Sequence, residues 1–119
     1  MIVALMTLLL SPPPDVFASV NEIRSRHGLP EFIADPELAV AAQEISEIRA
    51  NRNWPGHLPE KRWRQTTARS EGVGMRSGKD FSGKRFLSCC LFDRRWRYAG
   101  VGVSFNPRTK RTFYTLLVR

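Results

Sequence analysis

The chain has 119 residues, of which 42% are hydrophobic and 25% are charged, so it is one domain with a modest core and not a wholly disordered chain. Its net charge of +8 is uneven: residues 1–50 hold 3 Lys and Arg against 7 Asp and Glu, and residues 51–119 hold 16 against 4. The basic half can attract nucleic acid, anionic lipid or acidic cell-wall polymers, although a solvated basic surface gives the same count.

The first ten residues, Met1 to Leu10, are apolar apart from Thr7, and Ser11-Pro12-Pro13-Pro14 follows them. A stretch of this length is too short to cross a bilayer as a helix, but it suits the apolar region of a signal peptide. The positively charged segment that should precede it is missing. We therefore expect a truncated signal peptide over residues 1–18, a single domain over residues 19–119 and no transmembrane span.

Two helices are predicted next. Val16, Phe17, Val20 and Ile23 recur at three- and four-residue spacing, and Gly28 ends that helix. Asp35 then caps a second helix that has Pro36 at its first position. The predicted buried face of this second helix is Leu38, Ala41, Ala42, Ile45 and Ile48, and the predicted outward residues are Glu44, Glu47 and Arg49.

The remainder of the chain predicts a loop followed by a small sheet. Pro, Gly, Trp and basic residues fill Asn51 to Ser70 and indicate a long loop. The elements expected after it are a short strand at Glu71–Met75, a turn at Ser77–Asp80, a brief helix at Phe86–Phe92 and a hairpin of Gly100–Phe105 with Thr112–Val118.

Two cysteines, Cys89 and Cys90, are adjacent in the sequence. Neighbouring cysteines bridge each other only through a strained ring, so the chain has no disulfide framework. We expect them to be small buried apolar residues on a helix.

Several short segments, in the same order along the chain, resemble the bacterial branch of the CAP superfamily (cysteine-rich secretory proteins, antigen 5 and pathogenesis-related proteins, also called SCP domains). They are Val20–Arg24, Gly28-Leu29-Pro30, Asp35–Ala39 and Leu91–Val103, and the resemblance covers most of residues 16–119. It implies an α+β fold: a CAP-like α/β/α sandwich with two N-terminal helices and a C-terminal antiparallel β-hairpin in a small sheet. It also favours export, to the cell exterior or the periplasm.

The family's functional cleft holds two His and two Glu, and the resemblance implies that only part of this set is present. His57 falls at the first His position and Glu71 at one Glu position, whereas Leu87 stands where the second His is expected. The segment between Glu71 and Phe81 is also too short to carry the helix with the second Glu. The implied cleft residues are therefore His57 and Glu71, and Glu71 is expected to pair with His57 or with a neighbouring Arg.

One His and one Glu make a poor zinc site, because structural zinc sites use four protein ligands and catalytic sites usually three. We therefore expect no metal, no cofactor and no catalytic residue, in a degenerate member of the family. A metal-dependent hydrolase with a substituted ligand, such as Cys89 or Cys90, stays open as an alternative.

The basic run Arg94-Arg95-Trp96-Arg97-Tyr98 has its own two interpretations. Interleaved arginines and aromatics can stack on bases and neutralise phosphates, which makes Arg94, Arg95 and Arg97 candidate contacts for an anionic partner. Trp96 also fits a core anchor with the arginines as its solvated rim. No recognised binding motif accompanies the charge, so we do not expect nucleic acid to be the partner.

The sequence therefore predicts an exported, non-catalytic CAP domain whose partner is an apolar or lipid-like ligand or a cell-surface component. A basic domain that binds nucleic acid or anionic surfaces, and a decaying copy without activity, remain as alternatives. Loss of a covering helix would expose apolar sheet surface, which leads us to expect a homodimer.

Overall fold

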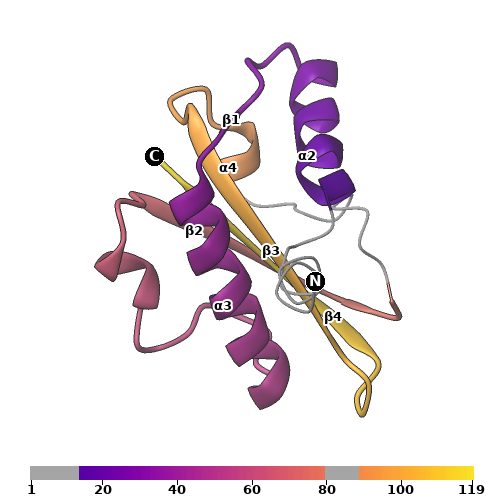
Figure 1. Ribbon diagram of the computed structural model, residues 1–119. Coiled ribbons are helices and arrows are strands. Elements are labelled where there is room, and N and C mark those ends of the chain that lie inside the picture. The colour runs from indigo at the N-terminus through magenta and orange to yellow at the C-terminus, as the bar shows by residue number, and fades with distance from the viewer. Residues whose placement is uncertain (1–13, 80–88) are drawn as a thin grey trace, which may run out of the picture.

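The computed structural model describes residues 14–79 and 89–119 (Figure 1). Predictions that concern residues 1–13, Phe81, Leu87 and the start of the brief helix at Phe86 lie outside these described residues. Within the described ranges, every helix is too short or too polar to cross a membrane.

A four-stranded mixed sheet forms the centre of the molecule, with strand order β1-β3-β4-β2. Strands β3 (Tyr98–Asn106) and β4 (Arg111–Val118) form an antiparallel hairpin, and β2 (Ser70–Ser77) pairs antiparallel with β4. The two-residue strand β1 (Ile33–Ala34) pairs parallel with β3. Because β2 and β3 both run opposite to β4, they begin at the sheet end where β4 finishes.

Helices cover both faces of this sheet, and alternation along the strands divides the core into two clusters. On one face, α3 (Pro36–Arg52) packs Leu38, Ala42 and Ile45 against Leu117. On the other, α2 (Pro14–Arg26) and α4 (Cys89–Phe92) contribute Val16, Val20, Cys90 and Leu91, which pack against side chains of β3 and β4. The predicted α+β fold with an α/β/α sandwich is confirmed.

The helix boundaries follow from the capping residues. The Asp35 carboxylate accepts hydrogen bonds from the backbone N–H groups of Glu37 and Leu38, and Pro36 occupies the first turn of α3. Asn53 ends α3 in the left-handed conformation, at φ 51°, and Gly28 follows α2 at φ 69°.

The loops contain regular structure that the sequence did not predict. The segment predicted as a loop from Asn51 includes the end of α3 and a 3₁₀ turn, η1, at Arg62–Gln65. Strand β2 continues to Ser77, two residues beyond the predicted strand, and β1 was not predicted. A two-residue strand has no alternation to detect, and its pairing with β3 depends on tertiary structure.

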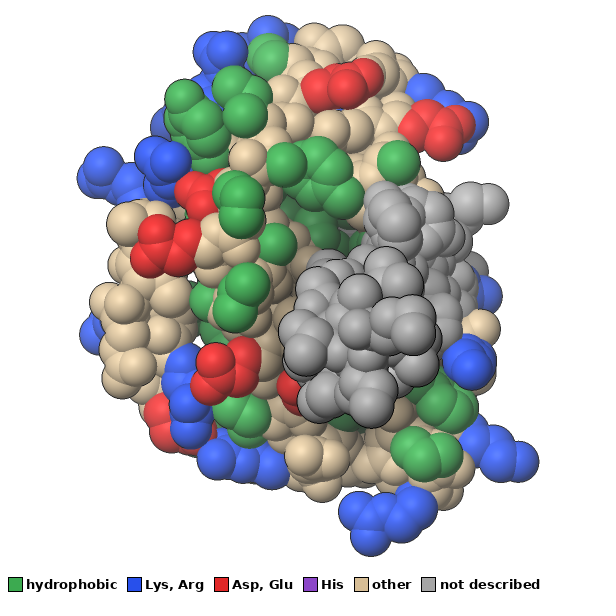
Figure 2. All heavy atoms as spheres, viewed as in Figure 1, with side chains coloured by type: hydrophobic (Ala, Val, Ile, Leu, Met, Phe, Trp, Pro, Cys, Tyr) green, Lys and Arg blue, Asp and Glu red, His purple; other side chains and the backbone are tan. Residues whose placement is uncertain are grey.

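Exposed apolar side chains are spread over the described surface. The large ones are Ile33, Val40, Trp54, Phe92 and Tyr98, which belong to different elements. In Figure 2 the apolar side chains form several small groups among charged ones, and Lys and Arg side chains stand around the margin of the view. The described residues thus show no single apolar face of the kind the homodimer expectation invoked.

Candidate functional site

His57 and Glu71, the two residues that the family resemblance placed in a cleft, lie in direct contact. The Nδ1 atom of His57 is 2.7 Å from Oε1 of Glu71. The Glu71 side chain is 3% exposed on β2, whereas the His57 ring, in the loop after α3, is 58% exposed. Since an ionised carboxylate can only accept hydrogen bonds, Nδ1–H of His57 is the donor. A buried carboxylate therefore orients a largely exposed imidazole.

Arg49 of α3 fixes the loop that carries His57. Its Nε donates to the carbonyl oxygen of Gly56 at 2.9 Å, and its Nη2 donates to that of Pro55 at 2.8 Å. The same guanidinium reaches the sheet, where it donates to the carbonyl oxygens of Tyr114 and Gly74. Arg49 thereby ties the two residues before His57 to β4 and β2.

The prediction that Arg49 faces outward is wrong, because the residue is fully buried. Ala41 and Ile48, predicted to be buried, are only partly so, while Glu44 and Glu47 are exposed as expected. The helical spacing of Leu38, Ala42, Ile45 and Arg49 was the signal that could have placed Arg49 on the buried face. Its charge argued against that assignment, since arginine is rarely buried unless its donors are satisfied.

The guanidinium of Arg49 also sets the local electrostatics. Burial lowers the pKa of Arg49 to about 10, and the charge of Glu71 acts in the opposite direction. Arg49 therefore remains a cation at neutral pH and offsets the buried negative charge of Glu71. The pair His57–Glu71 is thus supported by a fixed positive charge in the core.

The basic run predicted as an anionic-partner contact lies on the surface before β3. Arg94, Arg95 and Arg97 are exposed, and Trp96 is partly buried against the core, as expected. Arg94 donates to the carbonyl oxygen of Gly28 at 3.3 Å.

Arg95 makes a local ion pair that shifts the acidity of its partner. Its Nη2 is 2.7 Å from Oδ2 of Asp93, and hydrogen bonds from the side chain and backbone of Arg95 hold the pKa of Asp93 below its usual value. The structure therefore pairs Arg95 with an acid, whereas Arg94 binds a backbone carbonyl.

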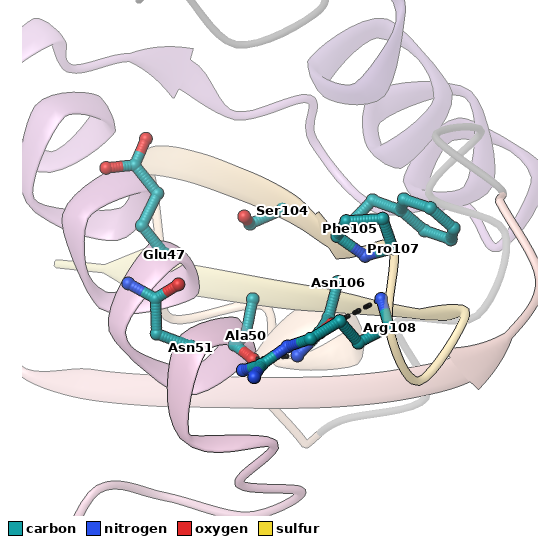
Figure 3. Close-up of a pocket in the computed structure, with 8 residues that line it drawn as sticks. All are labelled: Glu47, Ala50, Asn51, Ser104, Phe105, Asn106, Pro107 and Arg108. Atoms are coloured by element: carbon teal, nitrogen blue, oxygen red, sulfur yellow. Dashed lines mark hydrogen bonds between the residues drawn. The ribbon is translucent and has the colours of Figure 1, made fainter.

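The described residues include two surface hollows that are lined by neither His57 nor Glu71. One, of about 450 Å³, lies between the end of α3 and the β3–β4 turn (Figure 3). There the Asn106 side chain donates to the carbonyl oxygen of Ala50 and accepts from the backbone N–H of Arg108, so it serves to hold the turn. The other hollow, of about 350 Å³, is lined by Thr67, Arg69, Arg95, Arg97, Tyr98 and Arg119.

Several solved structures share this arrangement of helices and strands. An extracellular protein of Bacillus anthracis that contains an SCP domain superposes with a TM-score of 0.63 at 21% identity, over 87% of this chain and 39% of that one. The chain has a CAP-like fold. A cysteine-rich secretory protein of Staphylococcus aureus gives a TM-score of 0.54 at 13% identity, over 87% of this chain and 37% of that one.

The chain thus spans well under half the length of these two proteins, but 89% of a third structural neighbour. That neighbour is an outer surface protein of Borrelia burgdorferi, with a TM-score of 0.61 and 15% identity over 87% of this chain. No protein-family profile matches the chain, and no curated protein matches it in sequence. At these identities the likeness establishes the fold of the CAP-like domain.

The described residues of this CAP-like domain do not form a zinc site. Within residues 14–79 and 89–119, no three His, Cys, Asp or Glu side chains come together as metal ligands. His57 and Glu71 supply two donor groups, and one oxygen of Glu71 is engaged by His57. Cys90 is buried on α4, with its sulfur 3.1 Å from Oγ of Ser70, and belongs to no such group. The Cys89 side chain lies outside the described residues.

Proposed function

We propose that this chain is an exported, non-catalytic CAP-like recognition domain. The observation that carries the proposal is the His57–Glu71 contact: a 58% exposed imidazole is oriented by a carboxylate that is 3% exposed. An imidazole held in this way presents Nε2 for a hydrogen bond to a partner at a defined position. Recognition needs only this oriented polar group, whereas zinc chemistry needs further ligands.

A cell-surface component suits the described surface better than an apolar or lipid-like ligand. The two hollows described above are lined by charged and polar side chains as well as apolar ones, and neither is mostly apolar. Small-ligand sites for apolar molecules are concave and mostly apolar, because burial of apolar area supplies their affinity. Export is supported indirectly, because the fold resembles that of an extracellular protein and of an outer surface protein.

A zinc titration by calorimetry separates recognition from the metal-dependent alternative. The full chain is purified metal-free and compared with His57→Ala and with His27→Ala. The second variant is matched, because His27 is also exposed and its Nδ1 also bonds a single group, the carbonyl oxygen of Ile23. We expect no stoichiometric binding heat that depends on His57. Tight one-to-one binding lost only in His57→Ala would overturn the proposal and favour a substituted zinc ligand.

Export is tested by fractionating bacteria that produce the full chain with a C-terminal tag. We expect the chain outside the cytoplasm, and a Leu9→Arg variant retained within it, since a charge interrupts the apolar segment of residues 1–10. Equal cytoplasmic retention of both chains would contradict the export part of the proposal.

A further inference from the structure

Three arginines lie together because three strands share one end of the sheet. Ser70 of β2 and Ala99 of β3 both pair with Val118 of β4. Arg69, the residue before β2, is therefore next to Arg119, the residue after β4. Arg97 is the residue before β3, at the same end of the sheet. Neighbouring strands are about 4.8 Å apart, so this register gathers the three side chains at one place.

Backbone hydrogen bonds fix that end of the sheet. The carbonyl oxygen of Arg119 accepts from the backbone N–H groups of Arg97 and Tyr98, and Arg119 N–H donates to Tyr98. On the other side of β4, Arg69 N–H donates to the carbonyl oxygen of Val118 at 2.8 Å. The arginines thus project from ordered backbone positions, which reduces the entropy lost when they bind a ligand together.

These residues line the hollow of about 350 Å³, together with Thr67, Tyr98 and Arg95. Arg95 is paired with Asp93, and Arg119 donates to Oδ2 of Asp35 at 2.9 Å. The guanidiniums of Arg69 and Arg97 have no hydrogen-bond or ion-pair partner among residues 14–79 and 89–119. No Asp or Glu lines the hollow, so its walls carry four guanidiniums, of which those of Arg95 and Arg119 are paired with an acidic side chain.

The Tyr98 ring completes one wall. The Arg119 guanidinium lies over this ring, 4.2 Å from its centroid, and Tyr98 is 36% exposed. Stacking on this ring holds the Arg119 side chain in place. The Nε atom of Arg119 also donates a hydrogen bond to Asp35, the residue that caps α3. The hollow is therefore a basic surface site that does not include His57 or Glu71.

We propose that this hollow is an anion-binding site for a phosphate group, in which Arg69 and Arg97 make the principal contacts and Arg119 a supporting one. Planar guanidiniums bind phosphate oxygens through paired hydrogen bonds, and Thr67 offers a hydroxyl beside them. Binding relieves the repulsion among the arginines, which gives the site its affinity. The site goes beyond the proposed recognition role of His57 and does not depend on it. Arg94, which bonds Gly28, lies outside this hollow.

Calorimetry with inorganic pyrophosphate tests the site directly, on the full chain and on single variants. Arg97→Ala and Arg69→Ala should each weaken binding about tenfold, because each removes a charge-assisted bidentate contact. Arg108→Ala is the matched control: it removes the same charge from an exposed position at the opposite end of the β3–β4 hairpin. It should change the affinity by less than about twofold.

Asp35→Asn adds a variant with the opposite expected sign. Asparagine keeps the N-cap hydrogen bonds of α3 but releases Arg119 from its ion pair, so pyrophosphate should bind more tightly. A tightening cannot arise from loss of folding, which keeps the test informative if an arginine variant is destabilised. Repeating the titration on a chain extended by two glycines after Arg119 moves any terminal carboxylate away from the site.

Vesicle sedimentation distinguishes the sources of the phosphate group. If the protein co-sediments with phosphatidylglycerol–phosphatidylcholine vesicles and Arg97→Ala does not, the phosphate group belongs to a lipid headgroup. If the protein binds pyrophosphate but does not co-sediment with the vesicles, the phosphate group belongs to a soluble molecule or a polymer. The proposal is overturned if pyrophosphate does not bind, if acetate binds as tightly, or if Arg108→Ala loses as much affinity as Arg97→Ala. None of these results bears on zinc or His57.

Discussion

At the scale of single residues, two arginines are the largest fully buried side chains of the described structure. Arg24 on α2 donates hydrogen bonds to the carbonyl oxygens of Pro30, Leu91 and Trp96. Arg49 on α3 likewise donates to a carbonyl oxygen of the loop before His57, that of Gly56. Burial lowers the pKa of Arg24, as it does for Arg49. Each guanidinium thus donates hydrogen bonds to carbonyl oxygens of loop residues, and buried carbonyl groups without a donor would be destabilising.

Replacement of Arg49 should be strongly destabilising. Arg49→Met leaves buried carbonyl groups and the Glu71 carboxylate without their cation, so the free energy of unfolding should fall by about 3 kcal/mol or more. Arg52→Met is the control from the same helix, because Arg52 is 45% exposed and its ion pair is with Glu60, a surface residue. It should cost less than about 1 kcal/mol. Urea unfolding of both variants measures the difference, and equal costs would contradict the clamp role of Arg49.

Asp35 links stability to pH. Burial of the carboxyl group would raise its pKa, but hydrogen bonds from Arg119 and from the backbone of Leu38 and Glu37 outweigh this and lower the pKa below 3.8. The folded state therefore binds the proton less readily than the unfolded state, so this stabilisation is present above pH 3.8 and disappears as the pH falls through the folded pKa.

Asp35→Asn retains the cap and removes the charge, so it should be less stable than the wild type by about 1 kcal/mol at neutral pH. The gap should narrow as the pH falls through the lowered pKa of Asp35, because the wild type then becomes protonated as well. Thermal unfolding across a pH series from neutral to acid tests this prediction, and a gap that is independent of pH would refute it.

The sequence predicted the site residues His57 and Glu71, but it did not predict that Arg49 is buried and holds the loop before His57. His57 and Glu71 were found because short segments around them resemble a family, and no rule of local structure brings them together. Arg49 was misplaced because residue type outweighed helical spacing. What makes its burial tolerable is a set of carbonyl groups from Pro55, Gly56, Gly74 and Tyr114, which only the folded chain assembles.

At the scale of elements, two glycines set how closely α3 approaches the sheet. A Cβ atom on Gly100 would lie 2.1 Å from the backbone nitrogen of Ala39, and one on Gly102 would lie 2.3 Å from the carbonyl carbon of Ala42. Both neighbours are helix backbone, which cannot move aside without shifting α3 as a whole. The Gly-Val-Gly-Val segment of the family resemblance therefore has a physical reason: glycine on one face for α3, valine on the other for the α2 side.

Gly102→Ala should consequently destabilise the fold by about 3 kcal/mol or more, or prevent folding. Gly56→Ala is the matched control, since a Cβ there would meet no atom within 4 Å and the backbone has no positive φ. It should alter stability by no more than about 0.5 kcal/mol. Chemical denaturation of the two proteins provides the comparison, and a mild effect of Gly102→Ala would show that α3 is not in close contact with β3.

The elements that could be predicted carry their own local signals. Asp35 and Pro36 mark the start of α3, Gly28 ends α2, and β-branched and aromatic residues indicate the β3–β4 hairpin. The length of β2 could not be predicted, because its register with β4 extends through residues of weak strand preference such as Gly72 and Gly74.

At the scale of the whole molecule, α2 bears on the predicted domain boundary. The domain was predicted to begin at residue 19, but α2 starts at Pro14, and Val16 is only 1% exposed within the core cluster that includes Val101 and Leu116. A chain that begins at residue 19 should therefore be less stable than one that begins at residue 14 by roughly 2 kcal/mol, the value of burying one valine side chain. Thermal unfolding of the two chains tests this, and equal stability would support the boundary at 19.

The homodimer expectation is a separate question of assembly. The exposed large apolar residues of the described structure are dispersed among β1, α3, α4 and two other segments. A stable dimer usually buries a continuous face, so the described surface gives the expectation no specific support. Sedimentation velocity of the full chain at high concentration decides it: a concentration-dependent dimer supports the expectation, and a monomer throughout opposes it.

The central claim is that Glu71 orients His57 for recognition in a CAP-like fold that holds no metal there. Imidazole nitrogen NMR of the full chain at about pH 8, before and after addition of an equimolar amount of zinc, reads both parts at once. The account predicts a His57 ring protonated on Nδ1, with nitrogen resonances that zinc leaves unchanged. A ring protonated on Nε2 alone would contradict the pair, and a selective zinc shift of the His57 resonances would contradict the metal-free role.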